Sequence, residues 1–139
     1  RLTASASDYV LRVVSGSDIT KYYHENKMLK DQSRINLGSL ASSCMRHSWC
    51  QDYFKPYEDH AEMLILVHPE EDIIIGRALL WRDVNDVTNG SKINYMDRIY
   101  GDEQTYVLFK DWASENDFYH RRYQSFDSHK CIVKKRYQE

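Results

Sequence analysis

The chain has 139 residues, which is the usual size of one domain and enough to bury a hydrophobic core without a disulfide framework. Apolar residues make up 42% of it and charged residues 29%, which excludes an intrinsically disordered chain. The formal net charge of −2 is uneven, because residues 118–139 sum to +4 and the remaining residues to −6. Such asymmetry is typical either of an electrostatic binding face or of solvated strands.

The hydropathy, the cysteine count and the first residue of the sequence limit the class of protein further. No stretch approaches the roughly 18 consecutive apolar residues of a membrane-spanning helix, so we expect no membrane partner. The three cysteines, Cys44, Cys50 and Cys131, are odd in number, which favours a reducing compartment and hence a cytoplasmic location. The sequence begins at Arg1 rather than Met, as expected of one domain over residues 1–139 excised from a longer chain.

The first elements predicted along the chain are a strand and a short helix. Residues 9–14, with the sequence YVLRVV, are rich in β-branched side chains and predict a strand. The polar turn at residues 15–18 offers helix N-caps. Ile19, Tyr22 and Tyr23 then recur at helical spacing, which predicts a short helix.

A second helix is expected from Ser39, as its N-cap, to about Lys55. Its apolar stripe consists of Leu40, Ala41, Cys44, Met45 and Trp49. Pro56 should end the helix, because proline lacks a backbone N–H and clashes with the preceding turn.

The stretch from Met63 to Trp81 is the one around which the other elements can be arranged. Two apolar runs rich in Ile, Leu and Val flank the polar segment 68–72. This pattern predicts a β-hairpin whose strands are buried on at least one face. Gly76 inside the second run indicates a bulge, or a place where another backbone or a ligand comes close.

The rest of the chain predicts a strand, a helix and two more strands. Residues 92–100 predict the strand, and Asp102 is placed to cap a helix that runs to about Glu115. The expected buried stripe of this helix consists of Thr105, Leu108, Phe109, Trp112 and Ala113. Residues 118–126 and 131–137 predict the two final strands.

These elements together predict a single α+β (α/β) domain with one mixed, mostly antiparallel sheet and helices packed on it. Their order resembles that of the GNAT family, the N-acyltransferases that use acetyl-CoA. Residues 73–78, IIIGRA, look like the second half of that family's central hairpin. A strand that ends at residues 98–101, RIYG, and leads directly into a helix looks like its pyrophosphate loop, of pattern Arg/Gln-x-x-Gly-x-Gly/Ala. The resemblance implies that Arg98, Gly101 and the following N–H groups, with Arg77 on the neighbouring strand, hold the cofactor.

The match to the pyrophosphate loop is incomplete. Glu103 stands where the pattern has Gly or Ala, and Asp102 adds a second carboxylate beside it. Two carboxylates at a helix start repel a pyrophosphate and compete for the N–H groups that would bind it. The helix that follows the next strand in this family, and often carries a catalytic Tyr, is also missing from the predicted order.

Asp97 and Arg98 form the candidate site that the sequence favours most. They lie at the end of a central strand, next to a glycine and a helix start, where open sheets place ligands. Strand alternation points their side chains to opposite faces, and Arg77 is expected to share a face with one of them. A buried Asp–Arg pair that fixes strand register is equally compatible with the pattern. In an acyltransferase, Glu58 or Asp97 would serve as the general base.

A second candidate is a surface for single-stranded nucleic acid near the C-terminal end. Tyr119, Arg121 and Tyr123 are expected on one face of a strand, with Arg122 next to them. Aromatic rings stack with bases and cations meet phosphates, so this combination suits such a ligand. The acidic balance of the whole domain weakens this interpretation.

The spacing of Cys44, His47 and Cys50 is the most metal-like in the chain. Zinc would need a fourth ligand, for which His60 and His24 are candidates, and no second pair of ligands at zinc spacing exists. Two buried cysteines beside a polar histidine explain the pattern better, so no metal is expected. A nucleophilic cysteine with His47 as base is weaker still, because nothing in the sequence orients the base.

The patterns therefore favour a non-catalytic accessory or binding domain on a GNAT-like fold, without a cofactor, acting on a protein or nucleic-acid partner. Residues 43–46, 76–81 and 96–100 are similar to segments of uncharacterised proteins of bacteriophage type. That resemblance implies a viral accessory protein in the host cytoplasm. The alternative is an acyl-CoA-dependent N-acyltransferase with acetyl-CoA as its cofactor, and the incomplete pyrophosphate pattern decides against it.

Overall fold

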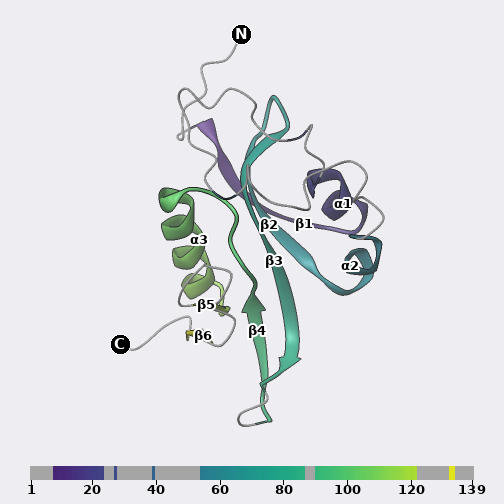
Figure 1. Ribbon diagram of the computed structural model, residues 1–139, viewed down its shortest axis with the longest axis vertical. Helices are drawn as coiled ribbons and strands as arrows, with labels where there is room; N and C mark the ends of the chain where they lie inside the picture. Colours follow the sequence, from purple (N-terminus) through teal and green to yellow (C-terminus); the bar gives the residue numbers. More distant parts are fainter. Residues whose placement is uncertain are drawn as a thin grey trace.

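The computed structural model describes residues 8–23, 27, 39, 54–86, 90–121 and 132–133. Six strands and three helices follow one another along this part of the chain (Figure 1). They are β1 (Val10–Ser15), α1 (Ser17–Tyr23), α2 (Lys55–His60), β2 (Glu62–His68), β3 (Ile73–Asn85), β4 (Lys92–Met96), α3 (Glu103–Glu115), β5 (Tyr119–Arg121) and β6 (Ile132–Val133).

The six strands form one mixed sheet in the order β1 to β6. Every neighbouring pair is antiparallel except β4 and β5, which are parallel. Figure 1 shows α1 and α2 on one side of the sheet and α3 on the other. The predicted α+β fold, with one mixed and mostly antiparallel sheet and helices packed on it, is therefore confirmed.

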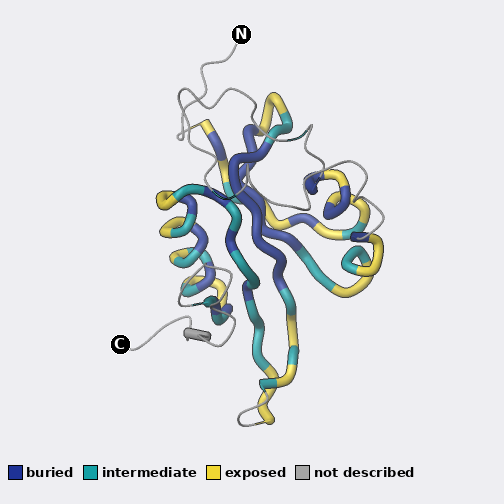
Figure 2. The backbone as a smooth tube through the Cα atoms, viewed as in Figure 1, coloured by how far each residue is buried: buried dark blue, intermediate teal, exposed yellow. Residues whose placement is uncertain are grey.

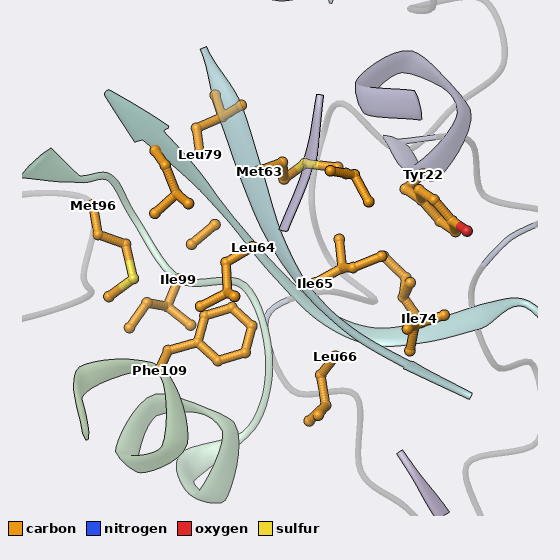
Figure 3. Close-up of a cluster of buried hydrophobic side chains, with 14 of the residues drawn as sticks. Tyr22, Met63, Leu64, Ile65, Leu66, Ile74, Leu79, Met96, Ile99 and Phe109 are labelled. Atoms are coloured by element: carbon orange, nitrogen blue, oxygen red, sulfur yellow. The ribbon is translucent and has the colours of Figure 1, made fainter. Parts of the chain in front are cut away.

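The central hairpin supplies both layers of the core because its side chains alternate between the two faces. Leu64 and Leu66 point towards α3 together with Met96, Ile99 and Phe109, whereas Met63, Ile65 and Ile74 point towards α1 and Tyr22 (Figure 3). Strand β2 is buried from Met63 to His68 (Figure 2). The prediction of a hairpin buried on at least one face is confirmed, and both faces are in fact covered.

Gly76 has both of the features that its place in the sequence indicated. Leu66 pairs with Gly76 and Val67 pairs with Ile74, so Ile75 is an extra residue that forms a bulge in β3. A Cβ atom at Gly76 would lie 2.5 Å from Thr105 Cγ2. The missing side chain therefore lets α3 approach the sheet closely.

Two predicted helix features are wrong. A regular helix does extend beyond Lys55: α2 runs from Lys55 to His60, and Pro56 occupies its first turn, where a missing N–H costs nothing. In α3, Asp102 is the N-cap and Asn116 the C-cap, as predicted. Leu108, however, is 43% exposed rather than buried, because the stripe that meets the sheet is Thr105, Phe109 and Ala113.

The predicted strand over residues 92–100 ends early, at Met96. Leu80 pairs with Met96 and Arg77 with Tyr100, so three residues of one strand face two of the other. Residues 97–99 therefore form a bulge in which strand alternation no longer fixes side-chain direction. The final predicted strands are observed as β5 and β6, although β5 begins one residue late, at Tyr119. Residues 122–126, 131 and 134–137 of these strands lie outside the described part, as does most of the helix predicted from Ser39.

Candidate functional site

The loop between β4 and α3 is the place where the family resemblance puts the pyrophosphate. Asp102 caps α3, and its Oδ1 accepts the N–H of Thr105 at 2.9 Å. The N–H of Gly101 donates to Ser39 Oγ at 3.1 Å. Two of the N–H groups at this helix start are thus bound by the chain's own oxygens, which leaves them unable to bind an anion at the same time.

Ser39 is fixed against this loop by several contacts. Its own N–H donates to the carbonyl of Gly101 at 3.1 Å, and its hydroxyl lies 3.2 Å from the hydroxyl of Tyr106 on α3. A Cβ atom at Gly101 would lie 2.6 Å from Thr105 Cγ2 and 2.7 Å from Thr105 Cβ. Glycine is therefore needed at position 101 because any side chain there would collide with Thr105 on α3.

Arg77 and Arg98, two of the predicted cofactor ligands, are brought together by the ring of Tyr100. The guanidinium carbons lie 5.0 Å (Arg77) and 4.8 Å (Arg98) from its centroid. Arg77 is only 1% exposed and also lies 4.1 Å from the ring centroid of Tyr23. Burial raises the pKa of Tyr23 to about 12, although Arg77 and its hydrogen bond act in the opposite direction. Arg77 thus joins α1 to the loop before α3 from inside the core.

Asp97 is linked to β5 and not to the side chain of Arg98. Its Oδ1 lies 3.4 Å from Arg121 Nη2 and accepts the backbone N–H of Arg98 at 2.7 Å. Its Oδ2 accepts the indole N–H of Trp81 at 3.4 Å. The sequence placed Asp97 in a functional pair with Arg98, whereas the structure joins it to Arg121, a residue predicted to bind nucleic acid.

An aromatic row crosses the sheet beside this ion pair. Trp81 pairs with Tyr95 and Tyr95 with Tyr119, so the three half-buried side chains lie next to one another on β3, β4 and β5. The ring of Tyr57 on α2 meets Trp81 edge-on at 5.7 Å, which places the row on the α1–α2 side of the sheet. Arg121 Nε donates to the hydroxyl of Tyr95 at 3.1 Å. This aromatic row therefore contacts both members of the Asp97–Arg121 ion pair.

Glu58, the other predicted general base, lies on α2. Its Oε2 accepts the hydroxyl proton of Thr20 on α1 at 2.5 Å, so the carboxylate holds the two helices together. The base role of Glu58 and Asp97 and the cofactor role of Arg77, Arg98 and Gly101 stay predictions. Arg122 and Tyr123 lie outside the described residues, as do Cys44, His47 and Cys50.

Two negative findings concern the described residues alone. No group of three or more His, Cys, Asp or Glu side chains is placed there to hold a metal ion. No helix among them is both long and apolar enough to cross a membrane.

Sequence reasoning missed Ser39, Trp81 and Tyr95 as parts of the site. Ser39 is 62 residues from Gly101 in the chain, and no local pattern signals such a contact. Trp81 and Tyr95 were detectable in principle, because cross-strand pairing of the predicted strands places them side by side once the register is known.

Comparisons with known proteins add little to this geometry. No protein-family profile and no curated protein matches the chain. Among solved structures, it is similar to a ribosomal-protein-alanine N-acetyltransferase from Brucella melitensis biovar Abortus 2308, with 15% identity and a TM-score of 0.41. The match covers 81% of this chain and 76% of that one. A likeness of this size carries no argument about ligand or activity.

Proposed function

We propose that the chain is a non-catalytic binding domain on a GNAT-like fold, without a CoA cofactor. The observation that carries the proposal is the hydrogen bond from the Gly101 N–H to Ser39 Oγ, together with the Asp102 cap on Thr105. These bonds occupy two of the N–H donors that a pyrophosphate at this helix start would use. Asp102 and Glu103 also place two carboxylates at the same helix start, which disfavours a highly charged anion.

The contact between β4 and β5 supports the same proposal. Within the described residues, the two parallel strands pair at Tyr95–Tyr119 and Met96–His120. Immediately beyond these pairs, the Asp97–Arg121 ion pair links the strands through their side chains. A carboxylate held by an arginine and by the indole N–H of Trp81 is poorly placed to act as a free general base.

The partner we propose is a protein or a nucleic acid, and the surface is the aromatic row formed by Trp81, Tyr95 and Tyr119. Half-buried rings suit packing against either partner, and the polar ends of Trp81 and Tyr95 are already hydrogen-bonded within the chain. Arg121 is engaged with Asp97 and Tyr95, so any phosphate contact falls to Arg122 and its neighbours. A phage-type accessory role, in the host cytoplasm if the parent chain is viral, forms part of this proposal.

A thermal-shift titration with acetyl-CoA, run beside free CoA, tests the proposal. A ligand that binds the folded state raises the melting temperature, by an amount set by the ratio of its concentration to Kd. We expect no rise with either ligand at millimolar concentration. A dose-dependent rise would support the acyltransferase alternative, and Arg98→Ala would then be expected to abolish it.

Retention on a single-stranded oligonucleotide column distinguishes the two classes of partner. A nucleic-acid partner predicts retention that falls steeply with salt, because binding releases counterions. Tyr119→Ala should weaken that retention by removing a stacking ring, whereas Val107→Ala, a change on the outer face of α3, should not. Absence of retention for the unmodified protein would leave a protein partner.

A further inference from the structure

Among the described strands, β1 lies at one edge of the sheet. Within the described part of the chain it pairs only with β2, in an unbroken register from Val10–Val67 to Ser15–Glu62. The main-chain N–H and C=O groups on the other side of β1 therefore point away from the sheet. Such a row is a template for pairing with another strand.

The side chains of β1 leave this edge open. Val10 is 42% exposed and Val13 is 38% exposed, and Arg12 and Ser15 are exposed as well. Edge strands are usually protected by charged side chains, proline or a bulge, and Arg12 is the one such feature of VLRVVS. By contrast, the β2–β3 and β3–β4 ladders inside the sheet are both interrupted by bulges. The regular ladder is thus the one beside the edge that no other described strand pairs with.

We propose that β1 pairs antiparallel with β1 of a second copy of the chain, about a two-fold axis at Val13. A two-fold axis perpendicular to the sheet keeps each face on its own side, so only residues of the same face can stand opposite each other. An axis at Arg12 would oppose two guanidinium groups. An axis at Val13 instead opposes the two exposed valines, and it places Arg12 opposite Val14 and Leu11 opposite Ser15.

The composition of β1 favours a second copy over an unrelated strand. Arg12 is its only charged residue, and the Val13 register separates the two copies of it. β-branched residues directly opposite one another stabilise a sheet. Each copy then contributes the same strand, β1, to the interface. Because the two-fold pairing uses this edge of β1 in both copies, the assembly ends at a dimer. The result is one sheet that runs continuously through both copies.

Cysteine cross-linking tests the register. Val13→Cys is made in a background in which Cys44, Cys50 and Cys131 are changed to Ser, so that the new thiol is the only one present. Directly opposed residues in an antiparallel pair have the spacing that a disulfide requires. We expect a covalent dimer under mild oxidation.

Val10→Cys in the same background is the matched control. It is equally exposed and lies on the same strand, but the proposed register separates its two copies by roughly 20 Å along the strands. We therefore expect it to stay monomeric on a denaturing gel. Equal cross-linking of both variants, or cross-linking of Val10→Cys alone, would overturn the proposed register.

Analytical ultracentrifugation tests the dimer itself with the native cysteines in place, so the proposal stays testable even if the cysteine-free background fails to fold. The unmodified protein should sediment as a dimer, and Val13→Lys should raise the dimer Kd at least tenfold by placing two ammonium groups opposite each other. Val107→Lys, at a site on α3 that is 60% exposed, should leave the dimer unchanged. A monomer at every concentration, assemblies larger than a dimer, or equal effects of the two lysines would overturn the proposal.

Discussion

Asp97 Oδ1 and Arg121 Nη2 lie 3.4 Å apart, immediately beyond the last paired residues of β4 and β5. The arginine side chain is 16% exposed and the aspartate side chain 33%. The same arginine also donates to the hydroxyl of Tyr95. This ion pair therefore ties the C-terminal strands to the centre of the sheet, at the position that the sequence assigned to a catalytic aspartate.

We expect Arg121→Ala to lower the free energy of unfolding by about 1–2 kcal/mol, a value between those of exposed and buried pairs. Asp97→Asn should cost a similar amount, because it removes the charge and turns one of the two acceptor oxygens into an NH2 group that faces a donor. Urea denaturation of the two single variants and the double variant measures their coupling, which we expect to exceed about 0.5 kcal/mol. Additive effects would show that the two side chains do not act as a pair.

Thr105 packs against both Gly76 and Gly101, and shortening its side chain should rescue an alanine at only one of these two positions. Alanine at Gly76 would place a Cβ 2.5 Å from Thr105 Cγ2, and we expect Gly76→Ala to destabilise the fold by about 1–3 kcal/mol. Thr105→Ser removes Cγ2 and should recover most of that loss. Thermal unfolding of the single and double variants measures the recovery.

Gly101→Ala is the matched comparison. Its Cβ would lie 2.7 Å from Thr105 Cβ, an atom that serine retains. Thr105→Ser should therefore fail to rescue it, and equal rescue at both glycines would contradict the packing described for α3.

Because Ser39 Oγ accepts the N–H of Gly101, removing this hydroxyl should help the loop to bind CoA. Ser39→Ala frees the Gly101 N–H, and Glu103→Ala restores the third position of the Arg98-x-x-Gly-x-Gly/Ala pattern and removes a carboxylate. We expect the double variant to show a dose-dependent rise in melting temperature with CoA that the unmodified protein lacks. Tyr106→Phe removes only the contact between the two hydroxyl groups and serves as the control. If the double variant gains nothing, occupation of the N–H group is not what prevents binding.

Asp72, in the turn between β2 and β3, predicts how stability depends on pH. Burial disfavours its ionised form, but hydrogen bonds from Tyr22, Lys21 and Lys27 outweigh this and lower its pKa to about 2. A carboxyl whose pKa is lower in the folded state stabilises the fold above its ordinary pKa and loses that contribution as the pH falls towards the folded value. Asp72→Asn should therefore cost stability at pH 7 and progressively less between roughly pH 4 and pH 2.

Urea denaturation across this pH range checks the prediction, with Asp59→Asn, at an exposed site on α2, as the control. The Asp72 contribution should also shrink with added salt, because its side chain is 34% exposed. A constant difference between the unmodified protein and Asp72→Asn over the whole range would contradict this account.

The sequence predicted the sheet well because its signals are local. Apolar runs, the glycine at position 76 and the cap at Asp102 each act within a few residues, and the structure confirms all three. Pro56 misled because a proline that stops one helix is equally suited to the first turn of the next.

The site was harder to predict because its contacts are long-range. The bulge at residues 97–99 removes the alternation from which the directions of Asp97 and Arg98 were inferred. The partners of Asp97 and Gly101, which are Arg121 and Ser39, are brought close only by the assembled fold. No pattern within either segment encodes these contacts.

The N–H of Gly101 gives the most direct test of the central claim. The chain has five glycines, so selective ¹⁵N-glycine labelling yields a spectrum simple enough to assign, with Ser39→Ala identifying the Gly101 resonance. We predict that this resonance stays unchanged when CoA is added to millimolar concentration, because Ser39 Oγ already accepts the hydrogen bond. A saturable shift of the Gly101 resonance would show that the loop binds the cofactor and would contradict the assignment of a non-catalytic binding domain.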